Sequence, residues 1–192
     1  MGVGRTLRGR TLGLYGYGRI AKAVAGYAEA IGMNVQWWAS DAGRERAIKE
    51  GARVAESREV FFNSSDIVSL HVRLKPETCG IITEADLANM QSRALLVNTS
   101  RSGLIATGVL EAEVACGRIF AAVDVFDQEP LRDRDNGLLT HPNVLPTPHV
   151  GYVTEDEFDL QFSDIFDQVN AYAAGKPIHM INSEAYAPSA NL

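Results

Sequence analysis

The chain has 192 residues, 46% hydrophobic and 22% charged, a balance typical of a globular chain that can bury a core in one large domain. Its net charge of −6, from 18 basic and 24 acidic residues, argues against a dedicated nucleic-acid or anionic-membrane binder. No apolar run is long enough to cross a bilayer and the first residues lack a signal-peptide core, so the expected location is cytoplasmic.

The cysteine and histidine content argues against a disulfide framework and a metal site. Cys79 and Cys116 lie far apart in the sequence, and we expect them to be free thiols that are buried or half-buried. The four histidines show no spacing typical of metal ligands, so no metal is expected.

A glycine-rich motif follows a basic lead-in over residues 1–10. Residues 11–21 read TLGLYGYGRIA, in which an apolar strand breaks at Gly16 and Gly18 and continues as a helix of small residues. The unpaired first amides of such a helix bind anions. Gly16 would allow a tight turn, Gly18 the approach of a phosphate, and Ala21 close packing of helix on strand. The alternative is a glycine turn in an ordinary βα unit.

The rest of the chain alternates short apolar strands with helical segments. Further strands are expected at residues 35–39, 52–54, 66–71, 94–98, 119–125 and 143–145. Further helices are expected at residues 44–51, 58–63, 83–90, 107–115 and 155–174, with Ser57 and Thr83 as N-caps of the second and third. This alternation predicts an α/β fold, a Rossmann-type doubly wound parallel sheet in a single domain with a C-terminal helix. The expected dinucleotide-binding domain spans residues 11–153, and residues 154–192 form the C-terminal helix and tail.

Three side chains at the carboxyl ends of predicted strands fit one chemistry. Arg101 suits a carboxylate ligand, and His149 with Glu129 as its orienting carboxylate suits proton transfer to a carbonyl oxygen. Taken singly, each has a simpler interpretation: a surface salt-bridge arginine, a solvated loop carboxylate and a histidine hydrogen-bonded at a strand end. Together they indicate an acid/base site for an anionic carbonyl compound.

Five motifs occur in a family-specific order and spacing, at residues 16–21, 70–78, 98–101, 124–130 and 147–149. With them the chain resembles the D-isomer-specific 2-hydroxyacid dehydrogenases over about residues 7 to 185. The resemblance implies an NAD(P)-dependent oxidoreductase that interconverts 2-keto and 2-hydroxy acids by hydride transfer. It implies that Arg101 binds the substrate carboxylate, that His149 is the general acid and base, and that Glu129 pairs with His149.

The resemblance also implies a nicotinamide dinucleotide as partner, with NAD expected and NADP possible, and a homodimer without nucleic-acid or membrane partners. Arg19 and Ile20 would offer backbone amides to the pyrophosphate, and Asp124 would face the nicotinamide carboxamide. The implied cofactor-binding residues are Gly16, Gly18, Arg19, Ile20, Ser40, Asp41, His71, Val72, Arg73, Thr78, Thr99, Ser100, Arg101, Asp124, His149 and Gly151.

The chain departs from the family most in its length. Members carry a substrate domain, of which about a hundred residues would stand upstream of the glycine motif, on ordinary domain sizes. We therefore expect an isolated cofactor domain that binds dinucleotide with little activity alone, and whose residues 154–192 would pack on the substrate domain. Two alternatives remain open: a non-catalytic dinucleotide-binding or sensing module, and a structural fragment that folds only as a dimer.

The residues after the second strand leave the choice of cofactor open. The acidic residue that binds the ribose of NAD is expected at the position of Ala39, whereas Asp41 stands two positions later. Arg44 and Arg46 follow and would suit NADP, although they could equally lie on a solvated helix face. Smaller departures are Arg73, where the family often has proline, and Ser102, where glycine usually follows the arginine.

Overall fold

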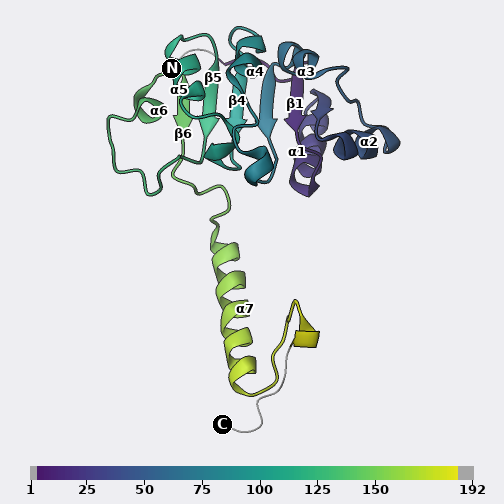
Figure 1. Cartoon of the computed structure of the whole chain (residues 1–192), viewed down its shortest axis with the longest axis vertical. Coiled ribbons are helices and arrows are strands. Elements are labelled where there is room, and N and C mark those ends of the chain that lie inside the picture. Colours follow the sequence, from purple (N-terminus) through teal and green to yellow (C-terminus); the bar gives the residue numbers. More distant parts are fainter. Residues whose placement is uncertain (1–3, 186–192) are drawn as a thin grey trace. The chain divides into compact units, whose positions relative to one another are not determined.

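A computed structural model describes residues 4–185, and the ends of the predicted lead-in and tail, residues 1–3 and 186–192, lie outside the described residues. The chain divides into two units, Met1–His149 and Val150–Leu192, and each is described by itself (Figure 1).

The N-terminal unit is built on one parallel sheet, as predicted. Its strands are β1 (Thr11–Tyr15), β2 (Asn34–Trp38), β3 (Ile67–Leu70), β4 (Leu95–Asn98), β5 (Phe120–Val123) and β6 (Val144–Pro146). All neighbours pair in parallel, in the order β2-β1-β3-β4-β5-β6. The chain therefore steps to one side of β1 to form β2 and to the other side to form β3, which is the switch in strand order that opens a crevice in doubly wound sheets.

Helices connect the strands. They are α1 (Arg19–Ala30), α2 (Asp41–Lys49), α3 (Arg58–Ser64), α4 (Glu84–Asn89), α5 (Val109–Ala115) and α6 (Gly137–Thr140), with 3₁₀ turns η1 (Pro76–Thr78) and η2 (Ser102–Leu104). The predicted caps are confirmed: Ser57 accepts from the amide of Val60, and Thr83 forms a capping box with Asp86. Helix α2 begins three residues earlier than predicted because Ser40 caps it.

Two hydrophobic clusters cover the two faces of the sheet, which is the doubly wound arrangement. Leu12 and Leu14 of β1 pack with the buried alanines of α1. Tyr15, on the opposite side of the same strand, packs with Phe61 and Phe62 of α3 in the larger cluster. The alternation of side chains along a strand places these two sets on opposite faces.

Three details differ from the predictions. Residues 52–54 form a single parallel bridge, between Val54 and Trp37, in place of a strand. Its position outside β2 still continues the Rossmann strand order. Helix α6 was not predicted, because its four residues are too few for a periodic pattern. Cys79 and Cys116 are free as predicted, but both are exposed, so their predicted burial is wrong.

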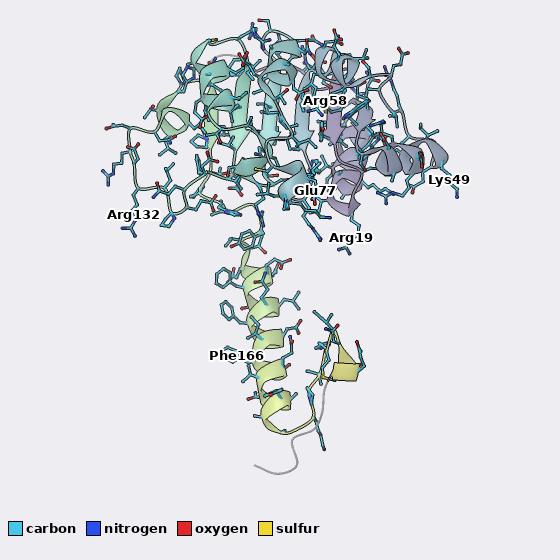
Figure 2. All side chains as sticks on the ribbon, viewed as in Figure 1. Arg19, Lys49, Arg58, Glu77, Arg132 and Phe166 are labelled. Carbon is cyan, nitrogen blue, oxygen red and sulfur yellow. The ribbon has the colours of Figure 1, made fainter. Side chains whose placement is uncertain are left out.

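The C-terminal unit contains the predicted long helix, α7 (Glu155–Ala173), and the 3₁₀ turn η3 (Ser183–Ala185). Thr154 caps α7 by accepting from the amide of Glu157, and none of its residues is buried. Figure 2 shows Phe166 projecting from this helix. Its exposed apolar side chains are Phe158, Leu160, Phe162, Ile165, Phe166, Val169 and Tyr172. None of the described helices is both long and apolar enough to cross a membrane.

Candidate cofactor and active site

A groove of about 610 Å³ lies at the carboxyl ends of β1, β3 and β4, at the switch in strand order. Figure 2 places Arg19 at the edge of the unit toward which the strands point. The structure brings these predicted cofactor residues together in its lining: Gly18, Arg19, Ile20, His71, Val72, Arg73, Thr99, Ser100 and Arg101. Ligands bind at this place in open parallel sheets.

The glycine turn shapes one end of the groove. Gly16 has φ +117, and a Cβ there would lie 2.5 Å from the carbonyl oxygen of His71. Gly18 is the N-cap of α1, so no side chain at this position bonds the first amides of the helix. A Cβ on Gly18 would meet nothing within 4 Å. The first turn of α1 has no acidic residue. Its amides therefore face open space at the positive end of the helix, where a phosphate would be stabilised.

The loop after β4 is held by Asn98, which is 1% exposed. Its side chain donates to the Arg101 carbonyl at 2.9 Å and accepts from the Ser100 amide at 3.1 Å. The Ser100 hydroxyl donates to the carbonyl of Leu70 at the end of β3, at 2.6 Å. These bonds determine where Arg101 leaves the sheet. Asn98 belongs to the motif at residues 98–101 but was not predicted as a site residue; a polar residue ending a buried strand was the available signal.

The side chains of His149 and Glu129, 20 residues apart in the chain, are within hydrogen-bond distance of each other. His149 Nδ1 lies 2.6 Å from Glu129 Oε2, and Glu129 Oε1 accepts from the Phe126 amide at 2.9 Å. The hydrogen bond with His149 lowers the pKa of Glu129, and the Phe126 amide and the charge of Arg101 lower it further. Glu129 and His149 line one pocket together, whereas Arg101 lines the groove at the ends of β1, β3 and β4, so the structure brings two of the three predicted catalytic side chains into contact.

The backbone of His149 has φ +56, a left-handed conformation that is costly for a residue with a side chain. The preceding segment is braced: Thr147 donates its hydroxyl to the buried Asp124 at 2.6 Å and its amide to the carbonyl of Val123 at 2.9 Å. The side chains of His149 and Glu129 are 32% and 35% exposed, so the pair is accessible to a ligand.

The other predicted cofactor residues lie outside the lining of the groove. Thr78 holds the loop after β3, since its hydroxyl donates to the carbonyl of Arg73 at 2.7 Å and accepts from the amide of Lys75 at 2.8 Å. Ser40 and Asp41 begin α2 beyond β2. Gly151 belongs to the C-terminal unit. Their roles toward a cofactor stay predictions.

His71 should make the folding stability of the protein depend on pH in the acidic range. Burial lowers the pKa of its imidazole, whereas the unfolded chain takes up the proton near pH 6.5. Folding stability is therefore expected to fall as the pH drops below about 6.5. Urea unfolding at steps between pH 8 and pH 5 measures this loss. The His71→Asn variant should show a shallower loss; an equal slope in both proteins would contradict the assignment to His71.

Comparisons with known proteins agree with this geometry. Residues 2–151 match the family model of the D-isomer specific 2-hydroxyacid dehydrogenase NAD-binding domain. The chain is 36% identical over 186 residues to a glyoxylate reductase of Aeropyrum pernix, covering 96% of the chain and 55% of that protein. It resembles the crystal structure of a phosphoglycerate oxidoreductase from Vibrio cholerae, with a TM-score of 0.85 and 40% identity over 90% of the chain and 55% of that structure. An acyclic imino acid reductase solved with NADPH and D-Arg matches at 28% identity and a TM-score of 0.75, over 93% of the chain and 56% of that structure.

The chain therefore belongs to the D-isomer-specific 2-hydroxyacid dehydrogenase family and matches its NAD-binding domain. It spans between about a third and just over half of the curated relatives that it matches.

Proposed function

We propose that this chain is the cofactor-binding part of a dehydrogenase that interconverts 2-keto and 2-hydroxy acids. The contact between His149 and Glu129 carries the proposal. A domain that only binds a dinucleotide does not need an imidazole with a carboxylate partner.

Each side chain then has a defined task. Because Nδ1 of His149 faces Glu129, Nε2 is the nitrogen that would give its proton to the keto oxygen of the substrate and take it back in the reverse direction. Glu129 orients the imidazole by its contact with Nδ1. The guanidinium of Arg101 pairs with the substrate carboxylate. A bound nicotinamide supplies or accepts the hydride.

The residues of the groove fit such a cofactor. The open amides of α1 suit its pyrophosphate, and the ends of β3 and β4 supply the remaining wall. We assign Gly16, Ser40, Thr78 and Asp124 to the same site by family resemblance. We also propose a cytoplasmic location and a homodimer. Sedimentation or light scattering with and without cofactor would test the homodimer.

The Gly18→Ala substitution tests the cofactor site without disturbing the fold. The added methyl meets no protein atom, so we expect only the small loss of stability, about 0.5–1 kcal/mol, that alanine in place of glycine costs at an N-cap. It would occupy the space of the phosphate, and we expect the dissociation constant of NAD(P)H to rise about tenfold or more, a loss of about 1.4 kcal/mol. Fluorescence titration measures this. Gly137→Ala, at another glycine with open space, is the control and should bind normally.

The His149→Gln substitution tests the chemistry. We expect a turnover of 2-keto acids that is lower by about 10²–10⁴-fold, as for loss of a general acid. NAD(P)H oxidation with a panel of 2-keto acids measures it. The curated relatives are about two to three times as long as the 192 residues, so weak turnover by this polypeptide alone is expected. Turnover that persists in His149→Gln would contradict the assignment.

A further inference from the structure

The end of β2 lacks a carboxylate where the ribose of NAD would need one. Ala39 holds that position, is 8% exposed, and packs so closely on α2 that a Cβ on Gly43 would lie 2.7 Å from its own. The hydroxyl of Ser40, the next residue, accepts from the amide of Gly43 as the helix cap. The usual hydrogen-bond acceptor for the 2′-hydroxyl is thus missing from the strand end.

A cation lies across the same strand end. Arg44 does not lie on a solvated helix face: its Nη1 donates to the carbonyl of Ala39 at 2.7 Å, and its guanidinium lies 4.3 Å from the ring centre of Trp38. Its side chain is 29% exposed, so one side of the guanidinium still reaches solvent. Stacking on an aromatic face and a carbonyl anchor hold the positive charge in one place.

This cation is close to the pyrophosphate turn. Trp38 pairs with Tyr15 in the sheet, and its carbonyl accepts from the amide of Gly16 at 2.7 Å. A dinucleotide whose pyrophosphate lies on α1 would place its adenosine ribose beyond the end of β2, beside Arg44.

We propose that Arg44 binds the 2′-phosphate of the cofactor and that this domain prefers NADP(H) to NAD(H). The inference rests on the proposed dinucleotide site. Of the five N–H donors of the guanidinium, one bonds the carbonyl of Ala39 and one bonds Asp41 at 2.5 Å, which leaves three for a phosphate. The carboxylate of Asp41 is 88% exposed and can turn into water when a phosphate takes its place.

Matched arginine variants on one helix test the proposal. Dissociation constants for NADP⁺ and NAD⁺ are measured by calorimetry for the wild type, Arg44→Gln and Arg46→Gln. Arg46 is an exposed neighbour on α2 and serves as the control. We expect the wild type to bind NADP⁺ at least about tenfold more tightly than NAD⁺. In Arg44→Gln the affinity for NADP⁺ should fall about 10- to 100-fold, the loss expected for hydrogen bonds to a charged group, and the affinity for NAD⁺ should be nearly unchanged. Arg46→Gln should change neither constant.

Two further variants make the result specific. Arg44→Lys keeps the charge but not the planar fork, so its NADP⁺ affinity should fall between those of the wild type and Arg44→Gln. Asp41→Asn removes the competing carboxylate and should strengthen NADP⁺ binding. Tighter binding of NAD⁺ by the wild type, or an equal loss for both dinucleotides in Arg44→Gln, would overturn this inference and leave the dehydrogenase assignment standing. Failure to bind either dinucleotide would overturn both.

Discussion

Replacing Gly16 with alanine is expected to lower the free energy of unfolding by about 3 kcal/mol and to abolish dinucleotide binding. Gly16 has φ +117, a conformation that residues with a Cβ rarely adopt, and the new methyl would lie 2.5 Å from the backbone carbonyl of His71. Backbone cannot yield as a flexible side chain can, so the ends of β1 and β3 would have to separate, at the crevice itself. Urea unfolding and NAD(P)H titration measure the two effects.

Gly26→Ala is the matched control on the helix that follows. This exposed residue lies inside α1, and a Cβ there would meet nothing within 4 Å. Alanine is the better helix former, so the variant should be more stable by about 0.5–1 kcal/mol and bind cofactor normally. If Gly16→Ala kept the urea midpoint of the wild type, the steric argument for the turn would be wrong.

The second large effect is expected for Asp86→Asn, at about 2–3 kcal/mol of lost stability. Asp86 is 5% exposed and accepts from Arg58 through both oxygens at 2.6 Å, and Arg58 also donates to the hydroxyl of Tyr15 and the carbonyl of Ile81. The amide would leave the guanidinium without its counter-ion and weaken the cap at Thr83. The figure is below that for a fully buried pair because the Arg58 side chain is 35% exposed.

The pair of Asp86 and Arg58 also predicts how the stability of the protein changes at acidic pH. Burial acts to raise the pKa of Asp86, but hydrogen bonds from Arg58 and Thr83 outweigh it and lower the pKa. Its contribution is complete above the unfolded value near 4 and is lost as the pH falls through the lower folded value. Unfolding curves below pH 5 for the wild type and Asp86→Asn should therefore converge. Glu50→Gln, in an exposed pair with Lys22, is the control and should show no measurable change.

The fold followed from local patterns wherever these were sufficient. Each sheet strand was predicted because a run of apolar residues buried on both faces has few other structures open to it. Ser57 and Thr83 marked helix starts because a hydroxyl can pair with an otherwise unpaired amide. Residues 52–54 were predicted as a strand because they are apolar enough, but pairing depends on a neighbour, and only Val54 meets one.

The candidate site could be predicted in part because parallel strands bring all their carboxyl ends to one edge of the sheet. Residues far apart in the chain, such as Gly18, His71 and Arg101, could thus be grouped from the order of the strands alone. The direction in which a long side chain points could not be predicted in this way. The sequence left Arg44 open between a solvated helix face and a cofactor contact, and only its packing on Trp38 distinguishes the two. The bracing of the loop by Asn98 likewise depends on tertiary contacts.

The left-handed backbone at His149 has an evolutionary consequence. Glycine has little cost in this conformation and asparagine less than histidine, so the backbone alone would favour replacing the imidazole. In any copy of the gene that is no longer selected for catalysis, random substitution at this position should therefore replace histidine. A duplicated, purely sensory descendant would be recognisable by glycine or asparagine there and by a higher melting temperature, which makes position 149 a marker of retained chemistry.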